Sequence, residues 1–200
     1  GVQPQTETVY RQADKYHVPR IAFINKIDRL GADFDRVLGE MNERLGTNAA
    51  GIEFPDGTED SFKGIIDVVN EQYINYKDKD GMEYERLPLP AEFAEKTKQY
   101  RHTLIERLAE VDDEMADLFL NSKEPTKEQI MQAIRRTVIA CKFVPVLVGT
   151  ALRNRGVQMV LDAIVDYLPS PLDIPPMRGH NPDNKEELIV RKPDENESPV

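Results

Sequence analysis

The sequence has 200 residues, of which 40% are hydrophobic, and a formal net charge of −10 at pH 7. This length supports one or two globular domains with a sizeable core, and no apolar run approaches the length of a membrane span. The acidic charge argues against direct binding of nucleic acid through its phosphates and favours basic protein partners. The single cysteine, Cys141, excludes an internal disulfide and suits a reducing compartment.

The first part of the chain alternates between helical and strand patterns. Pro4 suits the first position of a helix that ends near residues 17–19, and we expect this helix to pack on a sheet. The apolar run 21–24 predicts a short buried strand. Asp33 then suits the cap of a second helix, which Gly46 would end. A helix on either side of a strand is typical of a doubly wound α/β fold.

The polar residues Asn25, Lys26 and Asp28 follow this strand in the pattern Asn-Lys-x-Asp. Ligands of open parallel sheets lie beyond the carboxyl ends of the strands. Guanine presents two donors on its Watson–Crick edge, and one carboxylate accepts both, so we assign that contact to Asp28. The amide of Asn25 would donate to the purine or tie neighbouring loops together, and the stem of Lys26 would cover one face of the base.

The simpler alternative is a solvated turn, which uses the same residue types. From average residue usage, Asn-Lys-x-Asp should occur by chance in roughly one of every forty chains of this length. A second pattern raises the odds of a real site. Residues 143–148 predict another buried strand, which ends in Gly149, Thr150 and Ala151, followed by Leu152. Small residues let backbone N–H groups approach a ligand closely, so we expect this loop to complete the site.

Pro145 conflicts with the second strand, because proline cannot donate to a central ladder. We keep the strand as a prediction. We name no catalytic residue and no metal ligand in this sequence.

Between the two loops the pattern changes at about residue 46. Three segments predict strands of a small antiparallel sheet: 62–69, 72–77 and 82–86. Three helical patterns follow, the first opened by Pro90 and the third capped by a box from Thr126 to Gln129. We therefore expect an α+β subdomain over 46–140, inserted into a domain made of 1–45 and 141–176.

The last part of the chain begins with an amphipathic helix that stops at Pro169. The prolines at 171, 175 and 176 predict an extended stretch, and the polar residues after Gly179 include one strand-like run, 188–190. We expect residues 177–200 to link to a following domain.

Asn25-Lys26-Ile27-Asp28 together with Thr150-Ala151-Leu152 resembles the fourth and fifth signature motifs of the P-loop GTPases, and the surrounding sequence resembles translational elongation factor G. The likeness covers nearly the whole chain and is carried by residues 1–9, 23–29, 62–67, 156–158 and 166–171. The family usually has serine where Thr150 stands, and residues 49–60 look altered or shortened. Residues 133–136 and 151–158 look closer to the mitochondrial form.

The resemblance implies the C-terminal part of a P-loop GTPase domain: a mostly parallel sheet with flanking helices that carries an inserted α+β subdomain. GTP or GDP would be the ligand. The phosphate loop, the switch threonine and the magnesium aspartate of this class are not in this sequence and precede Gly1 in family order. Mg²⁺ would therefore bind only through that N-terminal part, and we expect this chain alone to be inactive.

The resemblance further implies a ribosome-dependent GTPase that promotes translocation of tRNA and mRNA. Its partners would be the ribosome, including the stalk protein through the inserted subdomain, with no membrane partner. The mitochondrial matrix is the expected location, and the bacterial cytoplasm is the alternative. Three other interpretations stay open: a ribosome-recycling paralogue, a protein-binding module for this piece alone, and an unrelated α/β protein with chance motifs.

Overall fold

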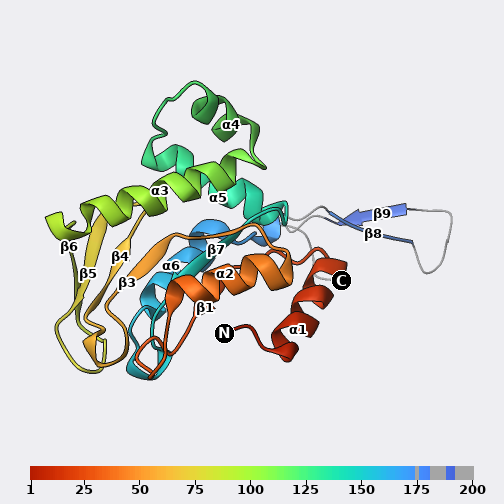
Figure 1. The fold of residues 1–200 in the computed structure, drawn as a ribbon. Coiled ribbons are helices and arrows are strands. Elements are labelled where there is room, and N and C mark those ends of the chain that lie inside the picture. Colours follow the sequence, from red (N-terminus) through yellow and green to blue (C-terminus); the bar gives the residue numbers. More distant parts are fainter. Residues whose placement is uncertain (174–175, 181–187, 192–200) are drawn as a thin grey trace. The chain divides into compact units, whose positions relative to one another are not determined.

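The computed structural model describes residues 1–173, 176–180 and 188–191, which divide between two compact units, 1–168 and 169–200. The helices and strands of the first unit (Figure 1) are α1 (Pro4–Lys15), β1 (Ala22–Ile24), α2 (Phe34–Leu45), β2 (Ala49–Gly51), β3 (Glu53–Asp56), β4 (Gly64–Asp67), β5 (Gln72–Tyr76), β6 (Tyr84–Pro88), α3 (Ala94–Ala109), α4 (Asp113–Leu120), α5 (Lys127–Ile139), β7 (Val144–Val148) and α6 (Val157–Tyr167). None of the described helices is long and apolar enough to cross a membrane.

The first sheet is parallel and has the strand order β1-β7-β2. Ala22 pairs with Val146 on one side of β7, and Ala49 pairs with Val144 on the other. Every residue of β7 is buried, as expected for the central strand of a parallel sheet. The parallel sheet with flanking helices confirms the predicted fold class.

The central position of Pro145 has a simple explanation. Backbone N–H groups of a parallel strand face its two neighbours alternately. Val144 donates to the β2 side (2.9 Å) and Gly149 donates to β1 (3.1 Å), so the nitrogen of Pro145 faces β1. Pairing with β1 begins only at Val146. The proline therefore costs the sheet no hydrogen bond.

Two strands that the sequence did not predict, β2 and β3, connect the parallel sheet to a second sheet. Ile52 lies between them. Its N–H donates to the Val146 carbonyl in the parallel sheet (3.0 Å), and its carbonyl accepts from the N–H of Val68 on the antiparallel side (3.0 Å). Residues 49–60, which looked altered, thus form the junction between the two sheets, and Ala49–Gly51 pairs with β7 in the parallel sheet.

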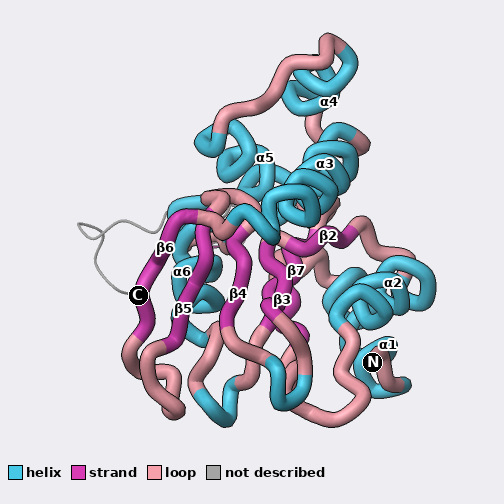
Figure 2. Tube along the Cα trace, turned by 60° about the vertical axis from the view of Figure 1, so that its left-hand side comes forward, coloured by secondary structure: helices cyan, strands magenta, loops and turns pink. Residues whose placement is uncertain are grey.

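The second sheet is antiparallel, with the order β3-β4-β5-β6, and Figure 2 shows its strands side by side. This confirms a small antiparallel sheet after residue 60. Helix α3 runs across one end of these strands (Figures 1 and 2). Phe54 of β3 is fully buried, and its ring centroid lies 4.6 Å from that of Tyr100 on α3. Leu104 and Leu108 of α3 are fully buried as well, so the helix and the sheet share one core.

The predicted helices α4, α5 and α6 all form. The capping box at the start of α5 is present, because Gln129 N–H donates to the hydroxyl of Thr126 (3.2 Å) and Thr126 N–H donates to the side chain of Gln129 (2.9 Å). Helix α5 contacts both β7 and α6. Fully buried Ile130 and Ile134 of α5 join the main core.

The expectation that α1 packs on the sheet was wrong. Helix α1 has no buried residue and lies beside α2, as Figure 2 shows. Polar contacts hold it there: Arg44 of α2 donates to the carbonyl of Val2 (2.7 Å) and pairs with Glu7 (2.5 Å). Val9, an apolar residue of α1, is 64% exposed.

The second unit contains a short helical turn and two paired strands among its described residues. The turn at Pro171–Asp173 replaces the extended stretch expected there. The strands β8 (Met177–His180) and β9 (Leu188–Arg191) pair antiparallel, so the strand-like run 188–190 is confirmed. The other residues of the predicted linker, 181–187 and 192–200, lie outside the described residues.

Two carboxyl groups in the first unit are buried where the two sheets meet. Glu53 and Asp67 are 4% and 7% exposed. Burial raises the pKa of both groups, and repulsion from Asp67 raises that of Glu53 further. A carboxyl group whose pKa is higher in the folded state than in the unfolded state makes its full contribution to stability at pH values below the unfolded-state pKa. That contribution is lost as the pH rises through the folded value.

We therefore expect Glu53→Gln to be more stable than the wild type near neutral pH, with the difference shrinking toward about pH 4.5. Thermal unfolding followed by circular dichroism between about pH 5 and pH 8 measures this. Glu95→Gln, an exposed residue of α3, is the matched control and should follow the wild type. Parallel pH profiles of wild type and Glu53→Gln would contradict the prediction.

Candidate functional site

The two loops singled out in the sequence lie next to each other at one end of the parallel sheet. Strands β1 and β7 are neighbours, and Ile24 pairs with Val148, so their carboxyl ends meet at the same edge. Two backbone hydrogen bonds continue the pairing into the loops: Gly149 donates to Ile24 (3.1 Å), and Ile27 donates to Gly149 (3.2 Å). The structure thus brings together segments more than a hundred residues apart.

The side chain of Asn25 ties the two loops together. Its Oδ1 accepts the N–H of Ala151 across the loops (2.9 Å) and the N–H of Lys26 within its own loop (2.7 Å). This is the second of the two roles expected for Asn25. The neighbouring Lys26 has a φ of +65°, a left-handed conformation that is uncommon for a residue with a side chain. The Lys26 side chain is exposed at the loop surface, as a residue that covers a bound base requires.

Asp28 lies beside the second loop. Its side chain is 10% exposed, and Oδ2 is 3.3 Å from Nε of Arg153. The Arg153 side chain is half exposed and reaches the carboxylate from solvent. A base that used both oxygens of Asp28 would therefore displace the Arg153 contact or share the carboxylate with it.

The loop after β7 is held rigidly by its own backbone. Thr150 is 1% exposed and exchanges two hydrogen bonds with Arg155, at 2.9 and 3.1 Å. Between them a short helical turn runs from Ala151 to Arg153, in which Leu152 is 88% exposed. The backbone of Thr150 and Ala151 is thus placed beside Asn25, whereas the side chain of Leu152 projects into solvent.

Sequence reasoning missed Arg155, which connects the site to the antiparallel sheet. Its guanidinium donates to the carbonyls of Phe62 (3.2 Å) and Asp78 (3.1 Å) and lies 5.4 Å from the ring centroid of Tyr76. The hydroxyl of Tyr76 accepts the N–H of Gly156 (2.6 Å). A basic residue in a loop carries no periodic signal, so only the tertiary structure reveals this role.

Gly156 ends the loop in a conformation that requires glycine. Its φ is +87°, and a Cβ there would lie 2.4 Å from the carbonyl oxygen of Val148. The chain can therefore turn from this loop into α6 only where the side chain is missing.

A cavity of about 490 Å³ lies along β1 and reaches Asn25 and Lys26. In the described residues β1 pairs only with β7, so its other edge is free. Residues of α2, including Val37 and Met41, form the opposite wall. The candidate base site therefore borders an open, partly apolar groove.

Comparison with known proteins agrees with this geometry. The family model for the elongation factor Tu GTP binding domain matches residues 1–170. Elongation factor G of Amoebophilus asiaticus (strain 5a2) is 49% identical over 199 residues, which cover 98% of this chain and 28% of that protein. A crystal structure of a protein from Thermus thermophilus superposes with a TM-score of 0.75 at 27% identity, over 88% of this chain and 26% of that one. The chain thus spans little more than a quarter of the length of these relatives. The match over residues 1–170 shows that it belongs to the elongation factor Tu GTP binding domain family.

Proposed function

We propose that this chain is the guanine-binding part of a ribosome-dependent translational GTPase. The observation that carries the proposal is the hydrogen bond from Ala151 to Asn25, which holds the second loop against the first and leaves Asp28 beside both. The roles follow from the chemistry of each group. Asp28 accepts the two donors of guanine, Lys26 covers the base, and the backbone of Thr150, Ala151 and Leu152 closes the site.

The residues present fit guanine but supply nothing for the phosphates. Mg²⁺ and the phosphate contacts belong to the part that the resemblance places before Gly1. The free edge of β1 and the groove beside it offer that part a place to add further parallel strands. We propose that residues 1–45 and 141–176 form the GTPase domain and that 46–140 is a subdomain inserted into it. Ala49–Gly51, near the start of this subdomain, pairs with the parallel sheet. We propose residues 177–200 as a linker.

This chain alone should neither hydrolyse GTP nor bind it tightly, because catalysis of phosphoryl transfer depends on positioning the phosphates and their metal. Phosphate release by the pure chain, compared with buffer and with the intact protein, measures the first point. Titration of guanine nucleotide measures the second. Turnover above buffer by the pure chain would contradict this prediction.

In the intact protein we propose that GTP hydrolysis drives translocation of tRNA and mRNA. The similarity to the elongation factor G of A. asiaticus supports this role. The alternative is a ribosome-recycling paralogue. A translocation assay run beside a subunit-splitting assay on the intact protein distinguishes them, because a translocation factor should be active in the first assay and a recycling factor in the second.

We also propose that the inserted subdomain contacts the ribosomal stalk protein. The acidic charge of the chain suits a basic partner. A pull-down with stalk protein, compared with a guanine nucleotide titration of the same sample, separates this role from base binding. We keep the mitochondrial matrix as the predicted location with the bacterial cytoplasm as the alternative, which the bacterial relative favours.

A further inference from the structure

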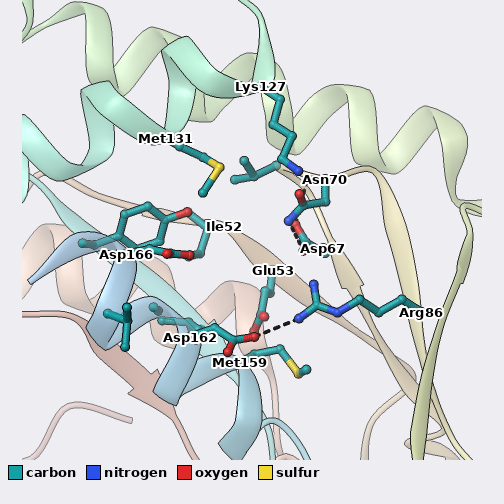
Figure 3. Close-up of a pocket in the computed structure, with 15 residues that line it drawn as sticks. Ile52, Glu53, Asp67, Asn70, Arg86, Lys127, Met131, Met159, Asp162 and Asp166 are labelled. Carbon is teal, nitrogen blue, oxygen red and sulfur yellow. Dashed lines mark hydrogen bonds and ion pairs between the residues drawn. The ribbon is translucent and has the colours of Figure 1, made fainter.

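A second cavity, of about 380 Å³, lies away from the guanine loops, between the junction of the two sheets and helices α5 and α6 (Figure 3). Its size falls in the range of small-molecule sites, which are mostly apolar with a few convergent polar groups. The apolar part of the lining includes Met131 of α5 and Met159, Val165 and Tyr167 of α6. Thioether and aromatic side chains together favour a flat, polarisable ligand body.

Glu53 gives this cavity its polar character. The residue is 4% exposed, and in Figure 3 its carboxyl group lies amid the lining, with Asp67 above it and Asp162 below it. One oxygen, Oε2, accepts a long hydrogen bond of 3.4 Å from the N–H of Val148. Among the described residues the other oxygen has no hydrogen-bond partner. A buried carboxyl with an unused acceptor lining a cavity is a position where a ligand donor would be strongly favoured.

The charges around the cavity are predominantly negative. Its lining contains four carboxyl groups and two cationic groups. Arg86 is paired with Asp162 (2.8 Å), and its positive charge also acts to lower the pKa of Glu53 and of Asp67. No cationic side chain of the described residues lies within ion-pair distance of Glu53 or Asp67, which faces Asn70 instead (2.6 and 2.9 Å).

From the cavity, its apolar walls and the unused oxygen of Glu53, we infer that this is a binding site for a small organic cation, a primary amine carried on a flat apolar body. The ammonium group donates to Glu53, and the body lies against Met131, Met159 and Tyr167. This site is independent of the guanine loops, and its ligand is not a nucleotide.

Proton linkage gives the inferred site a defined pH dependence. Burial raises the pKa of Glu53, and an ammonium ion beside the carboxyl group would lower it again, so amine binding should be coupled to proton release. Affinity for an amine should therefore increase with pH up to the raised pKa of Glu53. The other titratable or charged groups that face Glu53 from the surrounding elements are Asp67 (β4), Tyr76 (β5), Arg86 (β6), Lys127 (α5), and Asp162, Asp166 and Tyr167 (α6).

Three probes of one shape test the charge requirement: tryptamine, its neutral analogue tryptophol, and the anion indole-3-propionate. The six methionines of the chain, labelled at their methyl groups, report the location by NMR. Met131 and Met159 line the cavity, whereas buried Met41 and Met115 do not and serve as internal controls. We expect saturable shifts of Met131 and Met159 with tryptamine, and affinity at least tenfold weaker for the other two probes.

Two variants that each remove one negative charge complete the test. Glu53→Gln keeps the shape of the side chain and should weaken tryptamine binding at least tenfold and reduce its pH dependence. Glu95→Gln, exposed on α3, should leave binding unchanged. The inference is overturned if tryptamine produces no saturable shift up to millimolar concentration. It is also overturned if tryptophol binds equally well, or if Glu53→Gln binds as the wild type does.

Discussion

Replacing Asp28 by Asn in the intact protein should convert a guanine site into a xanthine site. In the proposed site the carboxylate of Asp28 accepts two donors of guanine, whereas an asparagine amide offers one donor and one acceptor. Xanthine carries an oxygen at C2 where guanine carries an amine, so the variant amide would donate to it. Sites built around buried polar partners can prefer one of two such ligands over the other by a factor of up to about 10⁴ to 10⁵. The low exposure of Asp28, 10%, places it in this class of site.

Competition binding of guanosine and xanthosine diphosphates to the intact protein measures this change. Asp80→Asn is the matched control, because it removes the same charge from an exposed turn of the chain. The control should keep the wild-type preference for guanine. An Asp28→Asn protein that still prefers guanine would show that Asp28 does not recognise the base.

Replacing Phe54 by Ala should cost about 3–5 kcal/mol of unfolding free energy, the range for removing a large buried aromatic side chain. Phe54 is fully buried on β3, at the junction of the two sheets. Its ring contacts Tyr100 (centroids 4.6 Å apart) and lies 6.4 Å from Phe93, and the ammonium of Lys96 lies 4.8 Å from its centroid. The alanine variant would leave a cavity between β3 and α3, where little can collapse to fill it.

Urea unfolding followed by circular dichroism measures the loss. Leu120→Ala, at the end of α4 and 82% exposed, is the control and should change stability by less than about 0.5 kcal/mol. A loss below about 1 kcal/mol for Phe54→Ala would mean that α3 does not depend on the sheet for its stability.

The elements predicted most accurately from sequence were those with a local signal. The capping box from Thr126 to Gln129 uses residues three positions apart, and both of its hydrogen bonds are present in α5. Gly46 ends α2 in the left-handed conformation expected of a stop signal. The strand before Asn25 is a short apolar run between polar residues. In each case neighbouring residues alone determine the outcome, so no tertiary information was needed.

The errors had long-range causes. The sequence predicted helix α1 but not its position, because polar contacts to Arg44, far along the chain, determine where it lies. Strands β2 and β3 were missed because each forms only through pairing with a more distant segment. Strand β2 pairs with β7, and strand β3 pairs with β4. Pro145 looked incompatible with a central strand until the register showed that its nitrogen faces the side where β1 has not begun.

Local sequence was enough to define the residue types of the candidate site, because Asn-Lys-x-Asp and Thr-Ala-Leu each follow an apolar strand and their chemistry suits one purine. The meeting of the two loops depends on the folded chain, since parallel pairing of β1 and β7 brings their carboxyl ends together and Asn25 joins them. The partners of Asp28 and the burial of Glu53 also depend on the folded chain, because contacts between distant segments arise only once the two sheets have packed.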